Sequence, residues 1–168
     1  MTTQGKEFVH QCILRMKENT PKIFACLDEL DEKEIWKRPN EASNSIGNII
    51  LHLCGNIRQY AISSLGHLTD ARERDKEFSA HGSLTKNELK EKLESTLKQA
   101  IGVIKNISEE ELLKIRLVQG FSLSGIGIII HVVEHYSYHT GQVVFWTKLL
   151  KNHGFDFYSN HDLNLKNE

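Results

Sequence analysis

Four long segments of the sequence repeat apolar residues at intervals of three and four, which is the spacing of one face of an α-helix. Only two prolines interrupt the 168 residues, and no segment shows the alternating pattern of a convincing strand. The sequence therefore predicts an all-α fold. The expected helices run from about Thr3 to Leu30, from a cap at Ser43, Asn44 or Ser45 to about Leu65, from Thr85 through Ile104, and from Ser124 to between Asn152 and Gly154.

Short helical turns are also expected where capping residues stand outside the long segments. Asp31 and Glu34 have the spacing of a capping box before a turn at residues 32–36, and Ser108 and Glu111 repeat that spacing. The segment from Lys114 to Phe121 is interpreted as a connection without regular structure.

One long polar stretch, His67 to Ser83, separates the second and third long helices. A connection of this length in a compact domain is usually a crossover or a functional segment. Arg72 and Arg74 within it are candidates to bind an anionic substrate group, with a solvated charged loop as the alternative. The sequence predicts a four-helix bundle with a crossover, in one domain covering residues 1–168 with a polar tail from about residue 159.

Three histidines, His131, His135 and His139, lie one helical turn apart in the last helix. Steps of four residues rotate by about 40° each, so the three imidazoles share one stripe of the helix. Imidazoles on a buried face need partners, and a metal ion satisfies two of them at once. The alternative is that each histidine hydrogen-bonds a neighbouring carbonyl or side chain. The apolar residues expected on the same face are Ile128, Val132, Val143, Trp146, Leu149 and Leu150.

A catalytic metal site needs a third protein ligand and an open position. His52, in the second long helix, is the best candidate, although its wheel position at the flank of the apolar stripe also fits a partly exposed boundary residue. Asn48 and Asn56, one turn to either side, are candidates to orient its ring. Gln142, one turn after His139, is a candidate to hydrogen-bond a ligand.

Charge and cysteine content limit the expected partners. The net charge of −1 gives no electrostatic reason to expect a nucleic acid or an anionic membrane as a partner. No apolar run approaches the roughly 20 residues of a membrane helix, and the N-terminus lacks the form of a signal peptide. Cys12, Cys26 and Cys54 form no metal-binding or disulfide pattern. These observations predict a cytoplasmic protein with reduced cysteines.

The phrases SNSIGNIILHLCGN and EHYSYHTGQVVFWTKLL resemble the DinB-like superfamily of bacterial metal-binding four-helix bundles. The phrases WKRPNEASNSIGN, HLCGNIRQY and HYSYHTGQ look closest to an uncharacterised branch, and the similarity runs from about Leu27 to Leu150. The resemblance implies an up-down-down-up bundle in which one histidine of the second helix and two of the last bind a divalent metal. The implied ligands are His52, His135 and His139. His131 is then a pocket residue, a support for the ligands or an alternative ligand.

The resemblance also implies a metal-dependent enzyme, because DinB-like relatives include thiol-dependent transferases and proteins described as hydrolases. It assigns no catalytic residue. Imidazole ligands suit zinc or nickel, with iron as an alternative, and a low-molecular-weight thiol is the implied cosubstrate for transfer to a small molecule. A non-catalytic bundle that the metal stabilises and a small-ligand binding or interaction module remain alternatives. Homodimerisation is a further implication, with Trp36 and Phe145 as candidate contacts.

Overall fold

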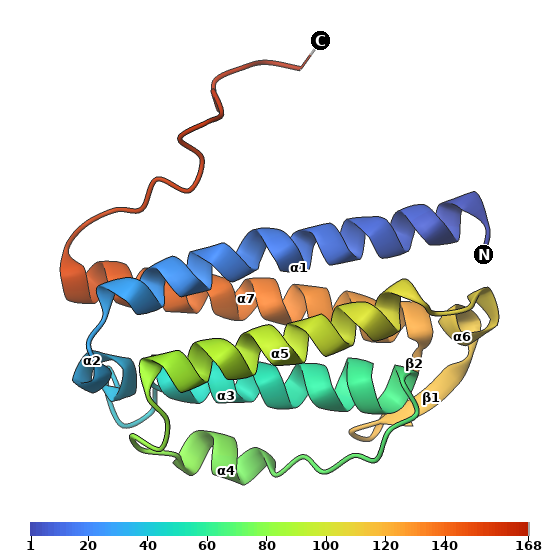
Figure 1. Cartoon of the computed structure of the whole chain (residues 1–168), viewed down its shortest axis with the longest axis horizontal. Helices are drawn as coiled ribbons and strands as arrows, with labels where there is room; N and C mark the ends of the chain where they lie inside the picture. Colours follow the sequence, from blue (N-terminus) through green and yellow to red (C-terminus); the bar gives the residue numbers. More distant parts are fainter. Residues whose placement is uncertain (168) are drawn as a thin grey trace.

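The computed structural model describes residues 1–167, most of which are helical, so the predicted fold class is confirmed. Four long helices run alongside one another, and a π-helix, η1, continues the second of them (Figure 1). Three short helices and a two-stranded hairpin lie in the connections. The long helices are α1 (Thr3–Glu29), α3 (Ile46–Ile57) with η1 (Arg58–Leu65), α5 (Lys86–Lys105) and α7 (Gly125–Lys151); the remaining elements are α2 (Glu32–Trp36), α4 (Arg74–Ser79), α6 (Glu109–Leu113), β1 (Ile115–Val118) and β2 (Phe121–Ser124).

Side-chain caps fix where most of these helices begin, as the sequence predicts. In each case an oxygen of the capping side chain accepts a hydrogen bond from a backbone N–H in the first helical turn. Pro21 lies inside α1 but does not divide it. The last helix ends at Asn152, whose left-handed conformation closes it. The capping residues are Thr2, Asp31, Ser45, Thr85, Ser108 and Ser124.

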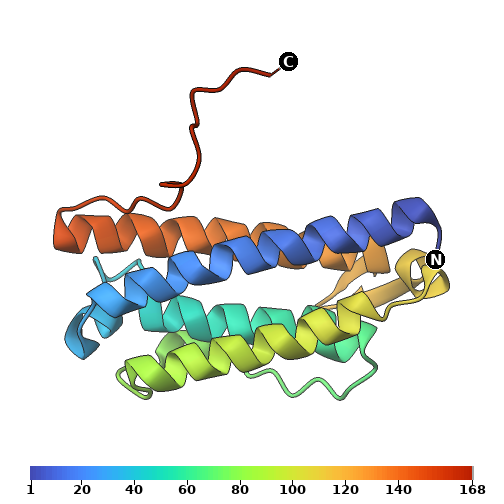
Figure 2. The same ribbon diagram turned by 45° about the horizontal axis from the view of Figure 1, so that its top comes forward.

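The bundle has up-down-down-up topology, because α1 and α7 run in one direction while α3 and α5 run in the other (Figures 1 and 2). Since α3 and α5 are successive long helices and run parallel, the chain must return along the length of the bundle between them. Residues 67–85 make this crossover, and α4 within it packs against α3. The crossover therefore lies beside the helix that carries His52.

The core fills the space between the four long helices. Met16, Tyr60 and Tyr136 are among the largest fully buried side chains, and the three cysteines are buried and free. Burial raises the pKa of the Cys54 thiol to about 12, which makes it a poor nucleophile at neutral pH. Leu149, expected on the buried face of α7, is 58% exposed, because it follows the exposed Phe145 by four residues and shares the outer face of the helix with it.

The connection expected at residues 114–121 is instead a β-hairpin, so the expectation of a chain without strands is wrong. Strand β1 pairs with β2 in antiparallel register, and Val118 faces Phe121 across the turn. The two turn residues, Gln119 and Gly120, both have positive φ, which is the geometry of a type I′ turn. Glutamine is not a favoured first residue of that turn, so the sequence signal is weak.

No helix within residues 1–167 combines the length and the apolar character needed to cross a bilayer.

Candidate metal centre

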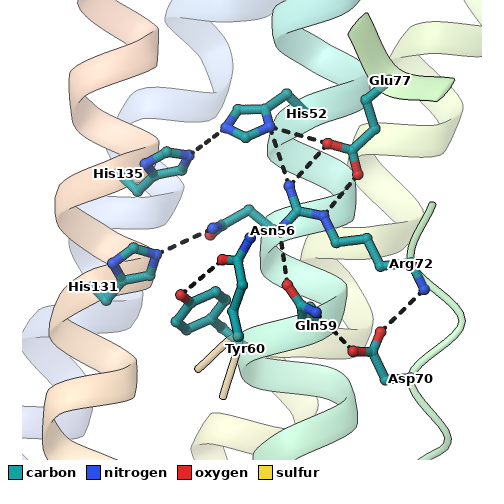
Figure 3. Close-up of polar contacts among 10 residues, drawn as sticks. His52, Asn56, Gln59, Tyr60, Asp70, Arg72, Glu77, His131 and His135 are labelled. Atoms are coloured by element: carbon teal, nitrogen blue, oxygen red, sulfur yellow. Dashed lines mark hydrogen bonds and ion pairs between the residues drawn. The ribbon is translucent and has the colours of Figure 1, made fainter. Parts of the chain in front are cut away.

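Three histidines from two helices meet between α3 and α7. His52 of α3 and His135 and His139 of α7 each offer a ring nitrogen, and these nitrogens all lie within 4.8 Å of one another. Figure 3 shows His52 and His135 directed at each other from neighbouring helices. The structure thus gathers the three residues that the resemblance implies as ligands.

His52 is buried, with 7% of its surface exposed, and is not the partly exposed boundary residue that its wheel position allowed. Two features of the crossover account for this burial. The ring of Phe78, from α4, packs on the imidazole with ring centroids 4.8 Å apart, and the side chain of Glu77 covers its outer nitrogen. A helical wheel takes no account of a crossover that packs on the helix from outside.

Glu77 and Arg72 hold the outer nitrogen of His52. Nδ1 of His52 lies 3.0 Å from Oε2 of Glu77 and 3.1 Å from Nη2 of Arg72. Nη2 of Arg72 already donates to Oε2 of Glu77 at 2.9 Å, and that carboxylate oxygen can only accept, so the ring proton is placed on Nδ1. Arg72 donates to both carboxylate oxygens of Glu77, at 2.8 and 2.9 Å, and to Gln59. The guanidinium is buried in this network, so Arg72 is neither solvated nor free to bind a substrate anion (Figure 3).

The hydrogen-bond partner of His139 fixes its ring in the same way. Nδ1 of His139 donates to Oε1 of Gln142 at 2.7 Å, as the sequence suggested for Gln142. The proton on Nδ1 leaves Nε2 as the nitrogen with a free lone pair. Metal-binding histidines commonly donate their other ring N–H to a carboxylate or carbonyl, which fixes the tautomer and the orientation of the ring.

The arrangement fits a metal ion by the chemistry of its donors. Nε2 of His135 and Nε2 of His52 are 2.9 Å apart, a hydrogen bond in which His135 donates because Nδ1 of His52 carries the ring proton. Two histidine nitrogens on one tetrahedral zinc ion lie about 3.3 Å apart, so a small adjustment converts this contact into shared coordination. Zinc, nickel and iron all accept three imidazole ligands.

His131 stands outside the cluster of three. Its Nε2 accepts a hydrogen bond from Nδ2 of Asn56 at 3.1 Å, and its ring stacks on Tyr60. Asn56 therefore holds His131 and not His52, and its buried Oδ1 has no partner within the described residues. Asn48 does not orient His52 either: its amide donates to the backbone carbonyls of Glu77 and Ala80, which holds α4 in place.

The surroundings of the three histidines of α7 favour neutral imidazole. Burial lowers the pKa of His131, His135 and His139, and the neighbouring histidines lower that of His135 further, to about 3. Burial alone would raise the pKa of Glu77, but the hydrogen bonds from Arg72 and His52 outweigh it and hold that pKa below its usual range. Neutral imidazole is the form that binds a metal.

These shifts predict how the stability of the metal-free protein depends on pH. Each histidine whose pKa is lowered binds its proton more readily in the unfolded chain than in the folded protein. Its contribution to stability is therefore complete above the ordinary pKa of 6.5 and is lost as the pH falls below that value, down to about 3 for His135. We expect the urea midpoint of chelator-treated protein to fall between pH 7 and pH 4. His135→Gln should flatten that fall, and His10→Gln, on the exposed face of α1, should leave it unchanged. Equal slopes in the two variants would contradict the prediction.

The supporting residues Glu77, Arg72 and Phe78 could not be identified from the sequence. They lie in the stretch with no clear periodicity, and Glu77 is 25 residues away from His52. The length of the crossover was the only indication that this stretch has a function. Tyr136, one residue after His135, is fully buried and shares a hydrogen bond with Thr20 across the bundle.

Comparison with known families and proteins places this geometry in context. A family model described as "Protein of unknown function (DUF1572)" matches residues 3–161. A search of curated proteins finds no match by sequence.

Solved structures share the fold at low sequence identity. A DinB-like protein from Bacillus subtilis, YjoA, is 14% identical with a TM-score of 0.67, over 88% of this chain and 96% of that chain. A DinB-like protein from Bacillus cereus is 13% identical with a TM-score of 0.64, over 80% and 87% of the two chains. A mutant of a mycothiol-dependent maleylpyruvate isomerase is 15% identical with a TM-score of 0.61, over 85% of this chain and 63% of that one. At these identities the likeness shows the fold alone.

Proposed function

The chain belongs to DUF1572, a DinB-like family of proteins of unknown function, and from this premise we propose that it is a metal-dependent enzyme acting on a small molecule. Its metal ligands in this proposal are His52, His135 and His139. The reaction proposed first is thiol transfer, and hydrolysis is the alternative reaction. Zinc or nickel is the expected ion, with iron as the alternative.

The observation that carries the proposal is the orientation of the three rings. Acceptors occupy Nδ1 of His52 and Nδ1 of His139, so the Nε2 lone pairs are left for the shared space that Nε2 of His135 also faces. Within residues 1–167 no fourth histidine, cysteine or carboxylate joins this group. Three protein ligands with an open position are typical of catalytic zinc sites, whereas structural sites have four.

The residues of the chain have separable roles in this proposal. A divalent ion held by three neutral imidazoles keeps its full charge and supplies a Lewis acid that lowers the pKa of a thiol or water, or polarises a carbonyl. Glu77 and Gln142 keep the rings of His52 and His139 in the tautomer that binds. The buried Oδ1 of Asn56 leaves a free acceptor beside His131. Thiol chemistry has the support of one further observation, the same fold in a mycothiol-dependent isomerase.

The experiment that tests the proposal measures metal per chain by elemental analysis after purification. We expect about one divalent ion per chain in the native protein, and loss of most of it in His52→Ala, His135→Ala and His139→Ala. His131→Ala should retain most of the metal, because Nε2 of His131 is bonded to Asn56. Circular dichroism checks that each variant is folded.

Two results would separate the alternatives. Retention of metal by both His135→Ala and His139→Ala overturns the ligand assignment. A metal that spectroscopy finds in a closed sphere of four protein ligands favours the non-catalytic bundle over the enzyme. If spectroscopy finds three protein ligands and an open coordination position, thiol conjugation is assayed first and ester and amide hydrolysis second.

Other expectations from the sequence remain proposals. Homodimerisation is one, and Phe145, 66% exposed on α7, is its better candidate contact. The indole N–H of Trp36 is bonded to the carbonyl of Leu84, and its ring packs against the core. The cytoplasmic location and the lack of a nucleic-acid partner are proposed from composition.

A further inference from the structure

A cavity of about 410 Å³ lies beside the candidate metal centre. Its walls come from the second half of α7, the beginning of α3 and the loop that precedes α3. It is a separate hollow from the cavity of about 330 Å³ behind Arg72 and Glu77, between the crossover and α5. Volumes of this size are within the range of small-molecule sites.

The cavity adjoins the histidine cluster at one residue, Gln142. Gln142 lines it, and Oε1 of the same Gln142 accepts the hydrogen bond from Nδ1 of His139. Ile49, on the opposite wall, precedes His52 on α3 by about one helical turn. The two helices that carry the ligands therefore also supply the cavity walls, and Gln142 stands between the cavity and the ring of His139.

The lining of this cavity has no charged side chain, which distinguishes it from the other four cavities described, each of which includes lysine or arginine. Phe145 and Leu149 form its outer edge and are 66% and 58% exposed. With Tyr138 and Gln142 they follow a spacing of four, three and four along α7, which places them on one stripe of the helix. An uncharged lining favours an uncharged occupant.

One polar donor of the lining residues has no acceptor within residues 1–167 and is open to an occupant. The indole Nε1 of Trp146 also lacks a partner, but protein atoms cover it completely, so an occupant of the cavity does not reach it. The Nε2 amide of Gln142 makes no hydrogen bond to the described residues, since only its oxygen is used. A bound molecule with a carbonyl or ether oxygen would give the half-buried amide of Gln142 an acceptor.

We infer that this cavity receives the body of the substrate, and that the substrate is a neutral small molecule with an aliphatic or aromatic body, a hydrogen-bond acceptor and a metal-binding thiol or carbonyl head. This inference rests on the proposed function, because the head is held at the three-histidine site. The apolar side chains Ile49, Phe145 and Leu149 select the body. The Nε2 amide of Gln142 orients it.

The test measures how the affinity for simple thiols depends on their length. Cobalt-loaded protein is titrated with ethanethiol, butanethiol and hexanethiol, and the dissociation constant is read from the change in the cobalt absorption spectrum. We expect the dissociation constant to fall about fourfold for each methylene that enters the cavity. Leu149→Asp should remove most of this dependence and leave ethanethiol binding nearly unchanged.

Ile130→Asp is the matched control, because Ile130 is an exposed apolar residue of the same helix outside the cavity. It should keep the native dependence on length. Phe145→Asp is a second test variant, and both test positions are exposed enough for the fold to tolerate the change. An affinity that is independent of length in cobalt-loaded protein, or equal behaviour of Leu149→Asp and Ile130→Asp, overturns the inference alone.

The oligomeric state distinguishes a substrate cavity from a contact with a second copy. Sedimentation of the native protein and of Leu149→Asp should give the same mass. A native dimer that becomes a monomer in Leu149→Asp, together with thiol dissociation constants that do not depend on thiol length, overturns the inference in favour of an interface between two copies. Failure of the protein to bind cobalt overturns the proposed function and this inference with it. These results are distinguishable, because metal content is measured before any thiol is added.

Discussion

Replacement of Arg72 by methionine is expected to lower the free energy of unfolding by about 3–5 kcal/mol. The guanidinium and the Glu77 carboxylate are almost completely buried, and Arg72 donates to both oxygens of that carboxylate. Methionine fills similar volume but leaves the carboxylate without its main partner, and an unpaired buried charge is costly. Urea denaturation of the metal-free protein at pH 7 measures the loss.

Two variants separate this effect from a general loss of charge. Lys76→Met removes a cation of the same crossover whose side chain is 75% exposed and pairs with the exposed Glu73, so it should change stability by about 0.5 kcal/mol or less. The double variant Arg72→Met, Glu77→Leu should regain much of the lost stability, because no buried charge remains. It should still bind metal about 10–100-fold more weakly, since Nδ1 of His52 has lost its acceptor. A single Arg72→Met variant as stable as Lys76→Met would contradict the prediction.

Local signals in the sequence were sufficient for the bundle itself. The caps Ser45, Thr85 and Ser124 each precede a long apolar periodicity, and each helix begins where its cap predicts. The hairpin was missed because its strands are only four residues long and its turn carries glutamine beside Gly120. The same apolar residues could equally have belonged to an irregular connection.

The site was predictable only as far as it follows helical spacing. His135 and His139 share a face because they are four residues apart, and Gln142 reaches His139 because it follows by one turn. The burial of His52 depends on Glu77 and Phe78, which the crossover brings from 25 and 26 residues further along the chain. No periodicity connects such positions, so Asn48 and Asn56, the nearest polar neighbours in sequence, were expected in the supporting role instead.

The crossover therefore has two structural roles, and both follow from its path along α3. It returns the chain along the bundle so that α5 can run parallel to α3, and on the way it covers the outer side of His52. Asn48 ties it to α3 through the backbone carbonyls of Glu77 and Ala80. A disturbance where the crossover contacts α3 should consequently affect stability and metal binding together.

Gly55→Ala creates such a disturbance at one point of that contact, and we expect it to destabilise the protein by about 1–3 kcal/mol. A methyl group at Gly55 would overlap Oε1 of Glu77 and lie 2.7 Å from its Cδ and 3.0 Å from Nε of Arg72. Side-chain ends often move aside at little cost, but this carboxylate is held by Arg72 and His52 and cannot move without breaking those bonds. Displacing it should also weaken metal binding about 10–100-fold.

The matched control is Gly102→Ala in α5, where a methyl group meets nothing within 4 Å. Alanine is the better helix former by about 1 kcal/mol, so this variant should be slightly more stable than the native protein and should bind metal unchanged. The two substitutions are chemically identical, and their opposite signs isolate the contact between Gly55 and Glu77. Urea denaturation and competition with a chelator for zinc measure the two effects. If Gly55→Ala matches Gly102→Ala in both measurements, the carboxylate is free to move and does not position His52.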